Sequence, residues 1–183
     1  MNPQPLVAIV GNPNAGKTSL FNSLTGSHQK VANYPGVTVE RISATLHLEG
    51  QSVECLDIPG LYSLEAQSMD EQVAVDAVMG RGEERVPDLL VCVLNAANLE
   101  RNLFLFSQVA EQGIPVVVAL TMTDLLREEG KAIDAIKLSN LLGVDVIPVI
   151  AHRGQGVDLL KEAIARNLED GRAPSPTVEY PAA

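Results

Sequence analysis

The stretch Gly11-Asn-Pro-Asn-Ala-Gly-Lys-Thr18 decides how this chain folds. It fits the pattern G-x-x-x-x-G-K-[ST] in full, which is typical of a loop that wraps a triphosphate with its backbone N–H groups. Glycine is required where a Cβ would block close approach or where φ must be positive. We expect Lys17 to bridge the β- and γ-phosphates and Thr18 to ligate Mg²⁺ through its hydroxyl.

The sequence on either side of this loop provides the context that the pattern requires. Residues 5–10 form a short apolar run, which is typical of a buried strand. Residues 17–25 carry apolar side chains on one helical face, and Gly26 is a suitable C-terminal cap. The helix dipole then points at the phosphates. A plain glycine turn with a surface lysine is therefore the weaker interpretation.

A phosphate loop alone is shared by kinases, ATPases and GTPases, and a second motif narrows the choice. Asp57-Ile-Pro-Gly60 matches D-x-x-G at the end of a predicted strand. We expect Asp57 to hold a Mg²⁺-bound water and the Gly60 N–H to contact the γ-phosphate, so that hydrolysis releases the following loop. Thr38 lies between the two motifs, where a threonine can complete the Mg²⁺ coordination.

The base-reading segment departs from the usual N-K-x-D, because the chain has Thr121-Met-Thr-Asp124. The Asp124 carboxylate can accept both guanine donors, a pair that adenine lacks. The Thr121 hydroxyl is too short to copy an amide that bonds both the base and the phosphate loop. A lost buried hydrogen bond costs about 1–3 kcal/mol, so we expect weakened guanine affinity and relaxed selectivity. In Ile150-Ala-His-Arg153, Ala151 can still donate its N–H to guanine, but Ile150 lacks the serine hydroxyl that usually steadies this loop.

Strands and helices alternate through the chain. Residues 42–48 alternate in polarity and pair with 53–57 through a hairpin turn, while 27–36 are expected to be a loop. Further strands are expected at 89–94, 115–120 and 144–149, and further helices at about 70–79, 99–110, 131–142 and 157–168. This pattern predicts an α/β, Ras-like P-loop GTPase fold with helices on both faces of a mostly parallel six-stranded sheet that has one antiparallel edge strand. Residues 1–170 are expected to form this domain and residues 171–183, with three prolines, a tail or linker.

The composition argues against a nucleic-acid partner and for a reducing compartment. The 183 residues include 13 basic and 23 acidic side chains, a net charge of −10. Without a basic stripe, a nucleic-acid partner is disfavoured. Cys55 and Cys92 lie in apolar runs and are expected to be buried thiols in a reducing compartment. Since no apolar run approaches the ~18 residues of a membrane span, the chain itself is expected to be soluble and cytoplasmic.

Three stretches carry a family resemblance: Gly11-Asn-Pro-Asn-Ala-Gly-Lys-Thr-Ser-Leu-Phe-Asn22, Asn33-Tyr-Pro-Gly-Val-Thr-Val-Glu40 and Asp57-Ile-Pro-Gly-Leu-Tyr-Ser-Leu64. Together they resemble the N-terminal G domain of the bacterial ferrous iron transporter family FeoB, over about residues 5–170. The resemblance implies slow GTP hydrolysis and a response to K⁺. It also implies a C-terminal membrane domain beyond residue 183 and a place on the cytoplasmic side of the inner membrane. The family's helical coupling domain would be absent or truncated.

The resemblance also suggests a K⁺ site. Asn14 matches a phosphate-loop ligand, and the carbonyls of Ala32 and Tyr34 match ligands from the first switch loop. Such a cation can stabilise transition-state charge as an arginine finger does. Leu61 stands where Ras-like enzymes carry a water-orienting glutamine, so slow turnover is expected. The candidate catalytic residues are Asn14, Lys17, Thr38 and Gly60, and the candidate nucleotide-binding residues are Asn14, Ala15, Gly16, Lys17, Thr18, Ser19, Gly36, Thr38, Asp57, Gly60, Thr121, Asp124 and Ala151.

Two other functions remain open at this point. One is a nucleotide-dependent switch with negligible hydrolysis, which Leu61 and the altered base pocket keep in view. The other is an RNA-associated GTPase, which the acidic charge argues against. His28, His47 and His152 are expected to be surface histidines rather than iron ligands. A homo-oligomer is left open.

Overall fold

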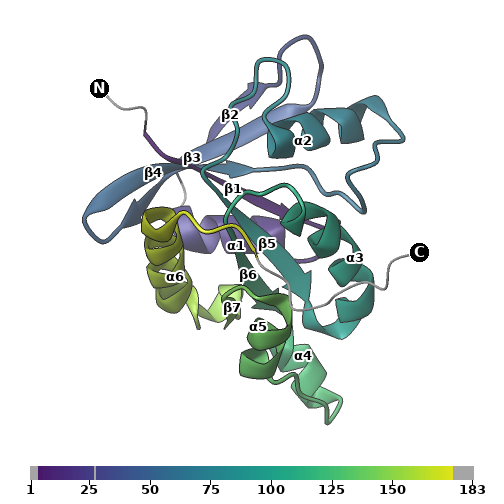
Figure 1. The fold of residues 1–183 in the computed structure, drawn as a ribbon, viewed down its shortest axis with the longest axis vertical. Helices are drawn as coiled ribbons and strands as arrows, with labels where there is room; N and C mark the ends of the chain where they lie inside the picture. Colours follow the sequence, from purple (N-terminus) through teal and green to yellow (C-terminus); the bar gives the residue numbers. More distant parts are fainter. Residues whose placement is uncertain (1–3, 27, 175–183) are drawn as a thin grey trace.

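The computed structural model describes residues 4–26 and 28–174, which form a seven-stranded sheet with helices on both faces (Figure 1). The strands are β1 (Leu6–Gly11), β2 (Lys30–Asn33), β3 (Glu40–Leu48), β4 (Gln51–Asp57), β5 (Leu89–Asn95), β6 (Val116–Thr121) and β7 (Val146–Pro148). The helices are α1 (Lys17–Thr25), α2 (Met69–Met79), α3 (Leu99–Ala110), α4 (Thr123–Glu128), α5 (Ala135–Leu142) and α6 (Val157–Asp170), with short 3₁₀ turns η1 (Ala96–Asn98) and η2 (Ala151–Arg153).

The strand order is β2-β3-β4-β1-β5-β6-β7. β1 pairs in parallel with β4 and β5, and β5, β6 and β7 continue in parallel. β3 is antiparallel to β4, as the hairpin pattern predicts. The mostly parallel sheet with an antiparallel edge is therefore confirmed.

Strand β2 is a correction to the sequence prediction, which expected a loop over 27–36, a six-stranded sheet and a single antiparallel strand. β2 pairs antiparallel with β3, from Lys30 opposite Ser43 to Asn33 opposite Glu40. All four residues of β2 are exposed, so the strand has no buried face. Because hydrophobic alternation is the main sequence signal for a strand, this one had none to find.

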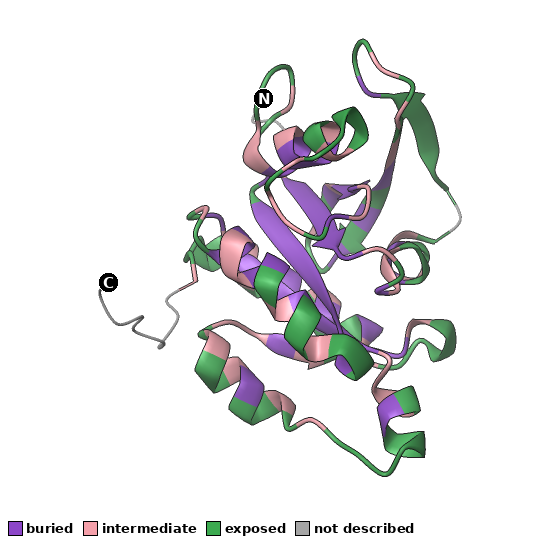
Figure 2. Ribbon diagram, turned by 90° about the vertical axis from the view of Figure 1, so that its right-hand side faces the viewer, coloured by how far each residue is buried: buried purple, intermediate pink, exposed green. Residues whose placement is uncertain are grey.

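Two hydrophobic clusters lie on opposite faces of the sheet. One packs α2, α3 and α5 against the sheet and includes Leu56 and Phe106, and the other packs α1 and α6 and includes Phe21 and Leu160. Successive β1 residues alternate between the clusters, as a strand buried on both faces requires. Figure 2 shows the buried strands in purple at the centre, with green exposed surfaces on the helices outside. Cys55 and Cys92 are both buried, as expected.

The predicted helix at 131–142 and the predicted strand at 144–149 are shorter in the structure. Asp134 accepts hydrogen bonds from the N–H groups of Ile136 and Lys137, so it caps α5, which begins at residue 135. The separate short helix α4 was not anticipated. β7 covers only Val146–Pro148. Most of the predicted tail lies outside the described residues, and within them no helix is long and apolar enough to cross a membrane.

Candidate nucleotide site

The phosphate loop leaves β1 at Gly11 and enters α1 at Lys17. A Cβ on Gly11 would lie 3.0 Å from the Val93 carbonyl oxygen, so the strand packing leaves room for glycine only. Gly16 has φ +91°, which glycine alone adopts readily. Asn14 also has a positive φ of 61°, a conformation that asparagine tolerates. The sequence pattern therefore corresponds to a formed loop at a helix N-terminus, the arrangement that binds phosphate.

Asp57 lies beside this loop at the end of β4. The Lys17 Nζ is 3.5 Å from the Asp57 Oδ1, and the two side chains are only 11% and 8% exposed. Burial raises the pKa of Asp57, and the nearby Lys17 ammonium opposes that rise. A desolvated carboxylate with one cationic neighbour is well suited to a second positive charge, such as hydrated Mg²⁺.

The donor set around Asp57 fits Mg²⁺, which prefers oxygen ligands and retains several waters. Thr18 is exposed in the first turn of α1, so its hydroxyl is open to a ligand. Within the described residues, no group of three or more His, Cys, Asp or Glu side chains is placed to hold a metal ion. His28, His47 and His152 are all exposed, as expected.

Gly60 packs directly against the phosphate loop. A Cβ on Gly60 would lie 2.9–3.0 Å from the Cγ, Cα and N atoms of Pro13. The Leu61 N–H donates to the Gly11 carbonyl over 3.1 Å, which extends the pairing of this segment along β1. The Leu61 side chain is fully buried in the core. It fills space in the hydrophobic cluster, and a leucine there offers no group to orient water.

The base pocket is a cavity of about 210 Å³ at the C-terminal ends of β6 and β7. Its lining includes five residues that the sequence predicts to bind the nucleotide: Gly16, Ser19, Thr121, Asp124 and Ala151. His152 lines it as well. The Asp124 carboxylate is 19% exposed, and its Oδ2 lies 3.9 Å from the His152 Nε2. A carboxylate that is largely buried yet faces the cavity can accept both donors of a guanine edge.

Thr121 retains part of the role of the usual asparagine. Its buried hydroxyl donates to the Ala15 carbonyl of the phosphate loop over 2.7 Å and lies 3.3 Å from the Leu94 carbonyl. A threonine has one donor, which the loop occupies here. Thr121 thus tethers the cavity to the phosphate loop, and its hydroxyl has no second donor to offer to a base.

Two residues that sequence reasoning missed steady the loop where Ile150 replaces serine. The Ser23 hydroxyl of α1 donates to the Ala151 carbonyl over 2.9 Å. Ile150 and Gln155 exchange backbone hydrogen bonds of 3.0 and 3.3 Å. Neither contact has a local sequence signal, because Ser23 lies 128 residues from Ala151 and the Gln155 contact is backbone only.

The first switch segment (residues 30–39) comprises β2 and the loop that joins it to β3. In the sheet, β2 is separated from β1 by β3 and β4 (Figure 1). Gly36 and Thr38 are exposed in the loop that joins β2 to β3. Lys17 and Asp57 thus adjoin each other, and Gly60 adjoins the phosphate loop, while β2, which carries Ala32, is three strands away from β1.

Tyr34 explains why this segment lies where it does. Its ring is 2% exposed and packs in the cluster formed by α2 and α3. Burial, reinforced by the charge of Glu84, raises the pKa of Tyr34 to about 12. The side chain thus anchors the switch segment beside α2 and the loop that follows it.

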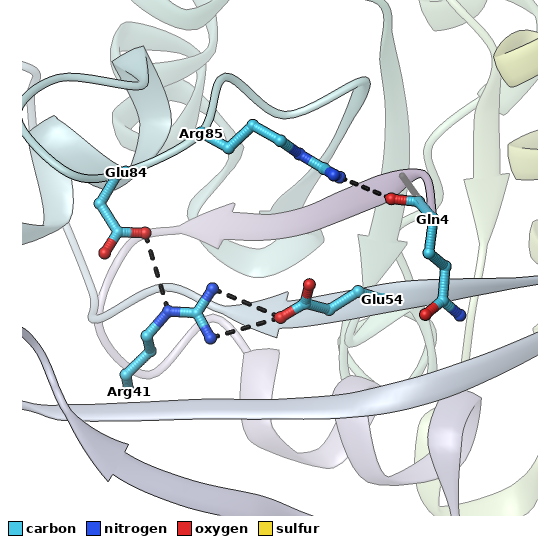
Figure 3. A network of polar contacts seen from close by, with 5 residues as sticks. All are labelled: Gln4, Arg41, Glu54, Glu84 and Arg85. Atoms are coloured by element: carbon cyan, nitrogen blue, oxygen red, sulfur yellow. Dashed lines mark hydrogen bonds and ion pairs between the residues drawn. The ribbon is translucent and has the colours of Figure 1, made fainter. Parts of the chain in front are cut away.

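Ion pairs strengthen this anchor at the start of β3 (Figure 3). The Arg41 Nη1 lies 3.3 Å from the Glu54 Oε1 on β4, and the Arg41 Nε lies 3.7 Å from the Glu84 Oε2. In the loop that contains Glu84, the Arg85 Nη2 donates to the Gln4 carbonyl over 2.8 Å. Arg41 thus connects the end of the switch segment to the loop between α2 and β5.

Comparison with known proteins agrees with this geometry. The profile of the family described as ferrous iron transport protein B matches residues 6–164. The Fe(2+) transporter FeoB of Salmonella typhimurium is 44% identical over 165 residues, 88% of this chain. That match covers 21% of the relative, so the chain spans about a fifth of the curated relatives it matches.

Solved structures give the same result. The crystal structure of the G domain of the T. maritima FeoB iron transporter has a TM-score of 0.81 and 37% identity, covering 89% of this chain and 98% of that one. The cytosolic domain of the same transporter in its GMPPNP form has a TM-score of 0.86 and 36% identity, covering 95% of this chain and 67% of that one. With its phosphate loop, D-x-x-G segment and base pocket formed on a Ras-like sheet, this chain belongs to the ferrous iron transport protein B family, FeoB.

Proposed function

We propose that this domain binds GTP and GDP with Mg²⁺ and hydrolyses GTP slowly. This proposal rests on one observation: three sequence motifs lie next to one another in the folded chain. The complete phosphate loop lies against Gly60 on one side and is tethered through Thr121 to the pocket of Asp124 on the other. A site with this arrangement can bind the triphosphate and the base of one nucleotide at the same time.

The roles of individual residues follow from this arrangement. Lys17 leaves Asp57 and contacts the β- and γ-phosphates instead. The segment that includes Ala15, Gly16 and Ser19 lies along the α- and β-phosphates. Thr18 would hold Mg²⁺ directly, and Asp57 would hold it through a water. The Gly60 N–H contacts the γ-phosphate, and Asp124 and the Ala151 N–H bind the base.

The first switch segment completes the site by moving. Thr38 would then join the Mg²⁺ ligands, and Gly36 would lie beside the γ-phosphate. K⁺ would bind between Asn14 and the carbonyls of Ala32 and Tyr34. The left-handed backbone of Asn14 and the exposure of its side chain support this role. Such a motion acts against the buried Tyr34 side chain, which holds the segment in its present place.

Within a whole transporter, this domain would regulate Fe²⁺ uptake. The named relatives are Fe(2+) transporters of which this chain covers about a fifth. We propose that residues 1–170 form the G domain, that residues 171–183 form a linker, and that a C-terminal membrane domain holds the protein at the cytoplasmic side of the bacterial inner membrane.

Single-turnover hydrolysis of GTP with Mg²⁺, in K⁺ and separately in Na⁺, tests this proposal. We expect slow hydrolysis that is faster in K⁺, and we expect Asn14→Ala to abolish the K⁺ advantage. Equal rates in the two salts, or an unchanged advantage in the variant, would remove the cation role.

A nucleotide switch with negligible hydrolysis is the second candidate, favoured by the fully buried Leu61. It predicts tight nucleotide binding with no turnover above the rate in buffer in either salt.

A further inference from the structure

Helix α3 holds the segment that follows Gly60, which we call the second switch segment (residues 61–68). The Leu64 N–H donates to the Gln108 Oε1 over 2.7 Å, and the bond is partly buried. The Arg101 guanidinium carbon lies 4.3 Å from the centroid of the Tyr62 ring, at the distance of a cation–π contact. Two side chains of α3, two helical turns apart, therefore hold the same short segment.

The other end of this segment is fixed to the phosphate loop. The Leu61 N–H bonds to the Gly11 carbonyl, and Gly60 packs on Pro13 with no room for a Cβ. Residues 60–64 are thus held between β1 on one side and α3 on the other. The direction of the Gly60 N–H depends on both attachments, because only a few residues of chain separate them.

Helix α3 is itself a rigid support. The Asn102 Oδ1 accepts from the Asn95 N–H at the end of β5 over 3.1 Å, and the Asn102 Nδ2 donates to the Asn98 carbonyl over 2.8 Å. Leu105, Phe106 and Val109 are buried in the core. A helix fixed by buried polar and apolar contacts cannot shift freely when the second switch segment moves.

We propose that Gln108 and Arg101 are positioning residues for the γ-phosphate. By holding residues 62–64, they keep the Gly60 N–H directed at the place that the γ-phosphate occupies. This inference rests on the proposed role of Gly60 in nucleotide binding. Because Gly60 contacts only the γ-phosphate, Gln108 and Arg101 set the preference for a nucleoside triphosphate over a diphosphate and have little effect on diphosphate affinity.

The test measures the affinities of GMPPNP and GDP in Mg²⁺ by displacement of a fluorescent GDP from the full chain. Gln108→Leu removes the acceptor of the Leu64 N–H, and Gln108→Glu keeps an acceptor oxygen at the same place. We expect Gln108→Leu to weaken GMPPNP about threefold to tenfold and to leave GDP within twofold, with Gln108→Glu close to the wild type. Arg101→Ala and Arg101→Lys form a second pair at an exposed position, and we expect the alanine variant to weaken GMPPNP selectively and the lysine variant to retain the cation above the Tyr62 ring.

Every other outcome counts against the inference. Equal losses for the two nucleotides would show that α3 only stabilises the fold, and unchanged affinities in both pairs would show that the contacts do not matter. A Gln108→Glu variant as weak as Gln108→Leu would exclude the acceptor role. A wild type that binds neither nucleotide would overturn the proposed function and this inference together, whereas the other results overturn this inference alone. None of these readouts needs hydrolysis.

Discussion

At the scale of single residues, Thr121 stands where the usual base-reading motif has an asparagine. An asparagine at this position would have two polar ends, and the threonine hydroxyl has one donor, which binds the phosphate loop. The sequence indicates that Thr121 cannot make every hydrogen bond that an asparagine would make, but it does not indicate which of these bonds is kept. Only the structure shows that the tether to the loop remains, because the Ala15 carbonyl lies 106 residues away in the chain.

Removing the Thr121 hydroxyl tests this tether. Thr121→Val keeps the shape but leaves the Ala15 carbonyl without its donor, so we expect unfolding free energy to fall by about 1–2 kcal/mol and GDP affinity to fall with it. Thr121→Ser keeps the hydroxyl and serves as the control. Urea denaturation and nucleotide titration measure both effects, and equal stability of the valine and serine variants would rule out the tether.

The two cysteines provide a second test at this scale. Both side chains have no exposed surface, and burial raises the pKa of Cys92 to about 12 and that of Cys55 even further. Since only the thiolate reacts with a disulfide reagent, we expect neither thiol to react at pH 8 in the native protein. Both should react at once in guanidinium chloride. Rapid labelling of one cysteine without denaturant would contradict the burial.

At the scale of elements, the segment of residues 30–39 differs most from expectation. The sequence indicates a loop there, because no apolar period is present, but the backbone pairs with β3 and Tyr34 is buried. By contrast, β1, α1 and the other core elements follow from their apolar patterns, since each buries at least one face. Within this segment, the exposed strand β2 pairs with β3 through backbone hydrogen bonds, which composition does not encode.

Tyr34 tests whether its ring or its hydroxyl holds this segment. Among the described residues its buried hydroxyl has no hydrogen-bond partner, so Tyr34→Phe should leave the unfolding free energy unchanged or raise it by up to about 1 kcal/mol. Tyr34→Ala should cost about 3–4 kcal/mol through the lost packing. Denaturant titrations compare the two variants. A clear loss of stability in the phenylalanine variant would contradict this account of the anchor.

Helix α5 gives an independent test of local structure, away from the nucleotide site. Asp134 accepts two backbone N–H groups at its start. We expect Asp134→Ala to lower unfolding free energy by about 1 kcal/mol, and Asp134→Asn to retain most of it because asparagine caps equally well. Nucleotide affinity should be unchanged in both. A loss of equal size in the two variants would point to charge rather than capping.

At the scale of the whole molecule, the site is assembled from segments that the sequence shows separately. The phosphate loop, Asp57, Gly60 and Asp124 were predicted from motifs, and the parallel sheet brings their strand ends to one edge. Ser23, Gln108 and Arg101 were not predicted, because they act through contacts between distant segments. Motifs therefore identify the groups that we expect to touch the ligand, while the contacts that hold these groups in place are visible only in the structure.

We propose that one site binds a triphosphate firmly and that Asp124 reads guanine there without help from Thr121. Competition of GTP and ATP for a bound fluorescent nucleotide, in Mg²⁺ and K⁺, tests this reading of the base. We expect GTP to displace the probe at a lower concentration than ATP, with ATP still binding measurably. ATP competing as well as GTP would contradict the role of Asp124, and tight binding with strict exclusion of ATP would contradict the role given to Thr121.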